Sequence, residues 1–313
     1  RAIMQLRHGT AALMITVVAT AGPAPAAGQS VGARVPAVSV IQMPYTGERN
    51  VAEISDNPGY LAGNGITDTI RTMGFTVAPE HTVGLTAEDE RAYGSWHRMG
   101  LANGHLAELV AQNGRSGVLT LGLLANCSSI LGVLGGLQHS GEPGTLRRVG
   151  LVYIDAHGDF NVPETTLSGM LGGMPVAVSA GMALHNLRRE SGLDPGIPTD
   201  HIVMAGVRDM DPLEADLVAT AGIRRLSSED LAHRPDRVRE EVERLAGTSD
   251  VIFVHVDMDV LDPAEVPGHS LAVRDGPTLK VSSGRDRART SSTVTGAAAA
   301  IDASEALIRS LTR

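Results

Sequence analysis

One apolar run ends in acidic and imidazole side chains at alternate positions, a pattern with obvious chemical potential. Residues 151–154 are apolar, and the chain then places Asp155, His157 and Asp159 two positions apart. In extended backbone, side chains two positions apart point to the same side. We therefore expect these three side chains to converge where a strand gives way to a loop.

A second stretch repeats this pattern further along the chain. Residues 251–256 are mostly apolar, and Asp257 and Asp259 follow them. Four carboxylates gathered with an imidazole at two strand ends repel one another, so we do not expect them to stay close together without a cation. The two stretches together predict a divalent metal site, and so many oxygen ligands suit two metals. Taken singly, each stretch also fits a structural interpretation, in which a strand-end Asp caps a helix and a His packs as a polar residue.

Length and composition set the broad class. The chain has 313 residues, of which 42% are hydrophobic and 19% charged, as expected for one α/β domain. The net charge of −9 and the lack of a basic stripe argue against a nucleic-acid partner. A single cysteine, Cys127, excludes an intrachain disulfide.

Residues 1–30 stand apart from the rest. Basic residues precede an apolar run from Thr10 to Gly22, and small residues and prolines follow as far as Gly28. The run is too short to span a bilayer, and the pattern is typical of a secretory signal peptide. A misassigned start, which would make this a non-core N-terminal segment, is the alternative. We expect residues 1–30 to lie outside the fold, with secretion or export to the periplasm if the signal peptide is real and a cytoplasmic location otherwise.

From Val38 onwards, strands alternate with helices, which predicts a parallel sheet covered on both faces. Two of the longer helices are expected over residues 86–112 and 170–187. In such folds ligands bind beyond the carboxyl ends of the strands, where both acidic stretches fall. We expect one domain over residues 31–313, with an atypical tail from about residue 277 in which only 297–311 reads as a helix.

The two motifs resemble the metal-binding motifs of the ureohydrolases, the family of arginase, agmatinase and formiminoglutamase. The resemblance runs from about Val38 to Gly276, and its main motifs are Asp155-Ala156-His157-Gly158-Asp159 and Asp257-Met258-Asp259-Val260-Leu261-Asp262-Pro263. It implies a three-layer αβα sandwich with a mostly parallel sheet, two Mn²⁺ ions, and homo-oligomers, as trimers or hexamers. It also implies a role in arginine metabolism, with hydrolysis of a guanidino compound to urea and an amine.

The resemblance assigns roles to single residues. Asp155 and Asp257 would bridge the two metals, Asp159 would complete one site, and His157 and Asp259 would belong to the other. A dimetal-bound hydroxide would attack the C–N bond of a linear amidine, with Asp155, His157 and Asp257 as the catalytic centre. Oxygen-rich ligation with one imidazole suits Mn²⁺ better than soft metals.

Matching positions on the substrate side favour arginase over agmatinase. Asn161 and Ser168 match the positions that hold the α-carboxylate of the amino acid, and Asp211 matches the acid that meets the α-ammonium. The structural alternatives are a loop-capping Asn, a turn Ser and a helix N-cap Asp.

Three departures from the family pattern bear on activity. Cys127 falls where the family has a metal-binding His; it is either a thiolate ligand, which would bias that site towards zinc, or a small buried hydrophobe. Gly172 falls where arginases have a proton-shuttling His. The last strand of arginases, with its guanidinium-binding Glu, has no recognisable counterpart in the tail.

We therefore expect a metal-dependent, arginase-like hydrolase that acts on a small guanidino substrate. The alternative is a catalytically impaired, single-metal relative that serves as a binding or structural protein.

Overall fold

The computed structural model describes residues 14–19, 37–47, 56–266 and 271–277. The strands are β1 (Met14–Ala19), β2 (Ala37–Met43), β3 (Thr76–Val77), β4 (His81–Thr82), β5 (Leu119–Leu124), β6 (Val149–Ile154), β7 (Ile202–Ala205), β8 (Arg224–Leu226) and β9 (Val251–Asp257). The helices are α2 (Asn57–Leu61), α3 (Thr67–Thr72), α4 (Ser95–Arg115), α5 (Ile130–Gln138), α6 (Pro175–Ser179), α7 (His185–Glu190), α8 (Pro212–Thr220), α9 (Ser228–His233) and α10 (Pro235–Thr248). The helix expected over residues 297–311 lies outside the described residues.

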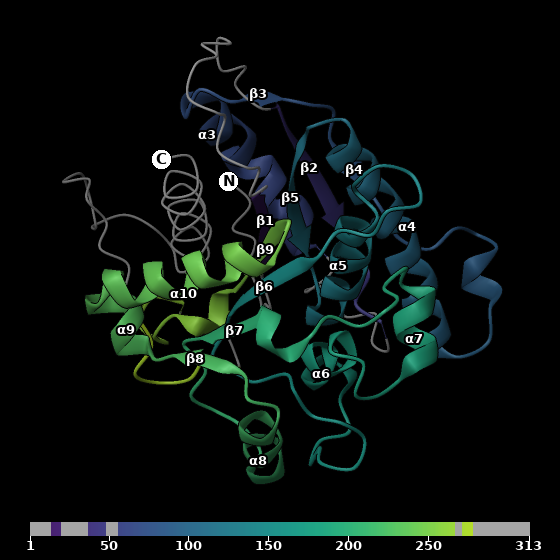
Figure 1. The fold of residues 1–313 in the computed structure, drawn as a ribbon. Helices are drawn as coiled ribbons and strands as arrows, with labels where there is room; N and C mark the ends of the chain where they lie inside the picture. Colours follow the sequence, from purple (N-terminus) through teal and green to yellow (C-terminus); the bar gives the residue numbers. More distant parts are fainter. Residues whose placement is uncertain (1–13, 20–36, 48–55, 267–270, 278–313) are drawn as a thin grey trace, which may run out of the picture.

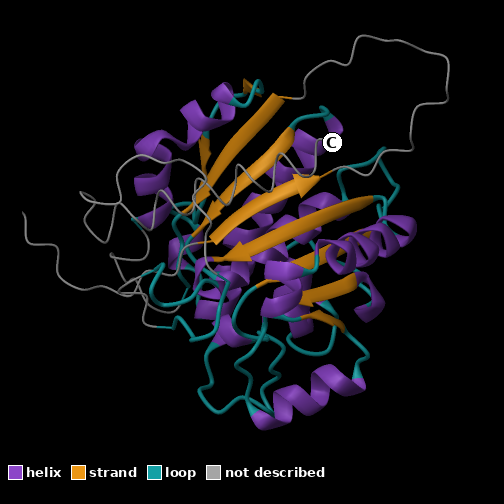
Figure 2. Ribbon diagram, turned by 90° about the vertical axis from the view of Figure 1, so that its left-hand side faces the viewer, coloured by secondary structure: helices purple, strands orange, loops and turns teal. Residues whose placement is uncertain are grey.

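All the strands pair into one sheet with the order β3-β2-β5-β1-β9-β6-β7-β8, and β4 pairs with β2. Every pairing is parallel except those of β1, which runs antiparallel to both β5 and β9. Figure 2 shows this one strand pointing against its neighbours in the middle of the sheet. Since β5 and β9 both oppose β1, they run parallel to each other, and their carboxyl ends lie at the same edge as that of β6.

Helices cover both faces of the sheet (Figure 1). On one face, Tyr153, Leu151 and Phe253 pack in a large cluster with residues of α4, α5 and α6. On the other face, Val152 and Val254 pack with residues that include Leu245 of α10, and a separate cluster joins β2 and β5 to α2 and α3. Because successive strand residues face opposite sides, β6 and β9 contribute to both layers of core. The predicted αβα sandwich is the observed architecture.

The place of β1 differs from the expectation that residues 1–30 lie outside the fold. Its backbone pairs with β5 from Met14 to Val17 and with β9 from Met14 to Ala19. The apolar run that suggested a signal peptide is also compatible with a buried central strand, and hydrophobicity alone does not separate the two. Removal of the segment as a signal peptide remains a prediction.

The two long helices expected over residues 86–112 and 170–187 are shorter or interrupted. Helix α4 begins only at Ser95, because Gly94 has a φ of +93° that a right-handed helix does not accommodate. The expected helix over residues 170–187 is divided into α6 and the start of α7, since Gly181 (φ +78°) and Leu184 (φ +46°) are both left-handed. No helix in the described ranges is long and apolar enough to cross a bilayer.

Candidate metal centre

Three strand ends bring the chemically active side chains together. Cys127 lies in a helical turn, η3 (Cys127–Ser129), shortly after β5, and Asp155 directly follows β6. Asp257 is the last residue of β9, and Asp259 lies in the next turn, η6 (Met258–Val260). Because β6 and β9 are adjacent and parallel, Asp155 and Asp257 emerge from neighbouring strands at one edge.

One group of candidate ligands consists of Asp155, His157 and Asp259, whose ligand atoms all lie within 4.8 Å of one another. The His157 Nδ1 atom is 3.0 Å from Asp259 Oδ2 and 3.5 Å from Asp155 Oδ1. The His157 main-chain N–H donates to Asp155 Oδ1 (2.7 Å), and the Ala156 N–H donates to Asp259 Oδ1 (3.2 Å). These main-chain bonds hold the carboxylates in place, so this half of the centre is oriented by the backbone of its own loop.

A second group consists of Cys127, Asp155 and Asp257, again with ligand atoms within 4.8 Å of one another. Cys127 Sγ is 3.8 Å from Asp257 Oδ2. Asp257 Oδ1 accepts a hydrogen bond from the Asp259 N–H (3.0 Å), which leaves Oδ2 facing the sulfur. Asp155 belongs to both groups, and Asp257 belongs to this one alone. The resemblance implies that both residues bridge two metals, and this role of Asp257 stays a prediction.

Asp159 lies beside these groups but belongs to neither. Its φ of +46° turns the chain out of the extended conformation on which the predicted alternation depended. Its carboxylate accepts a hydrogen bond from the hydroxyl of Tyr153, a buried strand residue that the motif did not indicate. Tyr153 in turn stacks on the ring of His255, with centroids 4.7 Å apart, so His255 is a packed strand histidine in contact with the group that orients Asp159.

The electrostatics of the cluster favour a bound cation. Burial, together with the charge of Asp259, raises the pKa values of Asp155 and Asp257 well above their usual range. Burial also raises the pKa of Asp159 to about 7, against the effect of the Tyr153 hydrogen bond. Burial alone would lower the pKa of His157, but its hydrogen bonds to Asp155 and Asp259 raise it to about 11. So many buried anionic groups are stabilised by a divalent cation, and the donor set of oxygens, one imidazole and one sulfur fits that role.

The side chains predicted to bind the substrate lie along one loop and at the start of α8. Asn161 Nδ2 donates to Asp211 Oδ2 (3.1 Å), and the Leu167 N–H donates to the same oxygen (3.2 Å). Asp211 is the residue before α8, as expected for an N-cap. Ser168 is exposed, and its Oγ accepts from the Met170 N–H (3.2 Å). Asn161 and Asp211 are therefore brought together, whereas Ser168 bonds within its own loop.

Glu214 links the loop after β6 to the start of α8, and the sequence motifs did not identify it. It is buried, and its carboxylate accepts from the N–H groups of Phe160 (2.7 Å) and Asp211 (3.0 Å). Burial raises its pKa. A Cβ atom on Gly158 would lie 2.6 Å from Glu214 Oε1, so a larger residue there would displace this carboxylate. The capping-box spacing between Asp211 and Glu214 was the signal available in the sequence.

Gly172 lies in open space close to the centre. It belongs to a helical turn, η4 (Leu171–Gly173), that contacts the turn carrying Cys127. A Cβ atom on Gly172 would meet nothing within 4 Å, and the same holds for Gly173. The fold therefore has room for a side chain where the resemblance implies a histidine.

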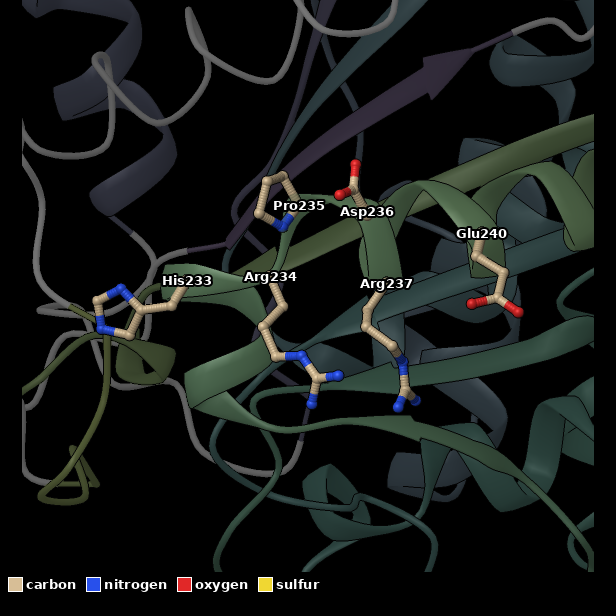
Figure 3. Close-up of a pocket in the computed structure, with 6 residues that line it drawn as sticks. All are labelled: His233, Arg234, Pro235, Asp236, Arg237 and Glu240. Carbon is tan, nitrogen blue, oxygen red and sulfur yellow. The ribbon is translucent and has the colours of Figure 1, made fainter.

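A separate surface hollow of about 360 Å³ lies at the junction of α9 and α10 (Figure 3). Arg234 and Arg237 point to the same side of it, while Asp236 points away. None of its lining residues is among the predicted site residues. This hollow is therefore distinct from the ligand groups at the strand ends.

The model of one protein family, described as the arginase family, matches residues 119–283, more than half of the chain. The chain belongs to the arginase family. Within that family it is similar to the arginase of Bacillus caldovelox, with 34% identity over 187 residues that cover 58% of this chain and 60% of the relative. It is also similar to an N(omega)-hydroxy-L-arginine amidinohydrolase of Streptomyces lavendulae, with 34% identity over 126 residues that cover 40% of this chain and 41% of the relative.

The arginase fold extends over more of the chain than these sequence matches. The native structure of the Bacillus caldovelox arginase superposes with a TM-score of 0.66 at 25% identity, covering 78% of this chain and 83% of that one. The predicted fold class is thus confirmed. In sequence, the chain spans 60% and 41% of the lengths of the two relatives named above.

Proposed function

We propose that this arginase-family protein is a metal-dependent hydrolase that cleaves a C–N bond of a linear amidine. A guanidino compound with an amino-acid-like end is the substrate, and urea and an amine are the products. The observation that carries the proposal is Asp155, a buried carboxylate common to two groups of candidate ligands. One carboxylate shared between two ligand groups would hold two cations close together, as a two-metal hydrolytic mechanism needs.

Two groups of side chains would hold the two cations. Asp155, His157 and Asp259 would hold one cation, and Cys127, Asp155 and Asp257 the other, with Asp159 close to both. When bound, the two cations supply Lewis acidity towards water and the amidine carbon. The oxygen-rich set with His157 suits Mn²⁺.

Substrate orientation would fall to the loop that follows the metal motif. Asp211 presents a carboxylate that already accepts from Asn161 and the Leu167 N–H, so it is held in place for an ammonium group. Asn161 and Ser168 would meet a carboxylate. A homo-oligomer, as a trimer or hexamer, is the assembly we propose with this function.

Urea release from a panel of guanidino compounds tests the proposal. The metal-free chain is loaded with Mn²⁺ alone or with Mn²⁺ and Zn²⁺ together, and is then given arginine, N-hydroxyarginine and agmatine. We expect urea from the two amino acids and much less from agmatine, because agmatine has no carboxylate for Asn161 and Ser168. Absence of urea from all three compounds in a chain with two bound metals would exclude the hydrolase.

The second candidate is a single-metal relative with a binding or structural role. Cys127 and Gly172 favour it, since both replace residues that the resemblance implies for catalysis. One metal per chain at saturation, without urea release, is the result that this alternative predicts.

Restoring an imidazole at Gly172 should accelerate turnover. The open space at this position accommodates the side chain, and a positioned general acid–base group is typically worth about 10²–10⁴-fold. We therefore expect Gly172→His to raise kcat for urea release. The pH profile of kcat should also gain an ionisation near that of histidine.

Gly173→His is the matched control, because a Cβ atom there also meets nothing within 4 Å. It introduces the same side chain one position away in the same turn. An equal gain in both variants, or no gain in either, would contradict a specific role for position 172.

A further inference from the structure

The two halves of the centre carry different donor atoms. One half has two carboxylates and the imidazole of His157, and the other has two carboxylates and the sulfur of Cys127. Thiolate is a soft ligand that favours Zn²⁺ over Mn²⁺, while oxygen and imidazole donors accept Mn²⁺. The chain's own residues therefore distinguish the two positions chemically.

The position of the sulfur fits coordination. A Zn–S bond of about 2.3 Å and a Zn–O bond of about 2.1 Å that meet at a tetrahedral angle separate the two ligand atoms by about 3.6 Å. The observed distance between Cys127 Sγ and Asp257 Oδ2 is 3.8 Å, a contact in which the thiol donates a hydrogen bond to the carboxylate and which a cation would replace. The sulfur and the carboxylate are thus already spaced for a shared tetrahedral cation.

The turn that holds Cys127 is itself fixed. The Asn126 side chain accepts from the Ser128 N–H at 2.8 Å, and its Nδ2 donates to the Thr46 carbonyl at 3.3 Å. These bonds set the backbone on both sides of the cysteine. Cys127 is half-buried and packs at the border of the main core cluster, with its sulfur towards two carboxylates that are almost fully buried.

We propose that the centre is a mixed-metal site, in which the Cys127 half binds Zn²⁺ through a thiolate and the His157 half binds Mn²⁺. The proposal rests on the two-cation centre of the proposed function, but not on the substrate or on turnover. Binding requires loss of the thiol proton to solvent, and it forms one Zn–S bond with no change of oxidation state.

Cobalt reports the thiolate directly. Co²⁺ replaces Zn²⁺ in such sites, and a cobalt–thiolate bond gives a charge-transfer band in the near ultraviolet that oxygen and nitrogen ligands do not give. The full-length, metal-free chain titrated with Co²⁺ should develop this band with one equivalent. Cys127→Ser should lose the band and bind one cation fewer, while Cys127→His should lose the band yet keep two cations and accept Mn²⁺ at both positions.

X-ray absorption of the zinc- and manganese-loaded wild-type chain is a second measurement that needs no variant. A shell of one sulfur at about 2.3 Å from zinc, with none around manganese, is the expected result. A zinc site with only oxygen and nitrogen neighbours, or a chain that binds cobalt without the sulfur band, would overturn the proposal and make Cys127 a packing residue.

The two proposals fail in different ways. Urea release with two bound Mn²⁺ ions and no sulfur signal would leave the hydrolase intact and remove the mixed-metal site. A sulfur signal in a chain that hydrolyses no guanidino compound would keep the mixed-metal site and remove the hydrolase.

Discussion

Asp155→Ala is expected to abolish urea release and to remove both cations, whereas Asp257→Ala should remove only the cation at the Cys127 half. The reason is that Asp155 belongs to both groups of ligands and Asp257 to one. Loss of the two-metal centre removes several kcal/mol of transition-state stabilisation, which corresponds to a fall of at least about 10³-fold in kcat/KM. Metal per chain after gel filtration and urea release from arginine measure the two effects.

The matched control is Asp250→Asn, which alters the acid at the opposite end of strand β9. Asp250 pairs with Arg148 at the surface, 2.7 Å away, and lies in neither ligand group. It should retain both metals and full activity. Loss of both metals in Asp257→Ala would contradict the restriction of Asp257 to one ligand group. Retention of one metal, or full activity, in Asp155→Ala would contradict the sharing of Asp155.

The melting temperature of metal-free Asp155→Ala shows whether lost activity comes from misfolding or from lost metal. Asp155 is buried beside other carboxylates, and burial keeps its pKa raised. Removal of this acid should therefore leave the melting temperature of the metal-free chain unchanged or higher at neutral pH. A large fall in that temperature would point to misfolding as the cause of lost activity.

Val17→Pro is expected to lower the free energy of unfolding by about 1–3 kcal/mol. Proline has no main-chain N–H, so a carbonyl group of a neighbouring strand in the middle of the sheet loses its hydrogen-bond donor. Val17 pairs with Leu121 of β5 on one side and with Val254 of β9 on the other. Since β9 ends in Asp257, we also expect weaker metal binding. Thermal unfolding with and without metal measures both effects.

Val17→Thr keeps the main-chain N–H and the β-branched shape, so it serves as the control. This experiment also tests the signal-peptide prediction. If residues 1–30 are removed before folding, a proline at position 17 cannot alter the stability of the purified protein, and identical melting curves would contradict a place for β1 in the sheet.

The residues that carry the proposed chemistry were identifiable from local sequence. Asp155, His157, Asp257 and Asp259 follow apolar strands, and the carboxyl ends of parallel strands meet at one edge by topology alone. Cys127 needed the family resemblance in addition, because a single cysteine has no local signature of ligation. The alternation of strands and helices was sufficient to predict the fold class. The spacing of apolar residues along the sequence distinguishes a helix from a strand without any tertiary contact.

Other features were decided only by tertiary structure, since they depend on contacts between distant segments. Asp159 is left-handed, and its carboxylate accepts a hydrogen bond from the Tyr153 hydroxyl, a contact that strict strand alternation does not predict. Its role as a metal ligand stays a prediction. Glu214 reaches back across the fold to Phe160, and no spacing predicts that hydrogen bond. The same limit applies to β1, whose hydrophobicity suits both an exported leader and a central strand. Only the positions of β5 and β9, which leave the width of one strand between them, place that segment in the sheet.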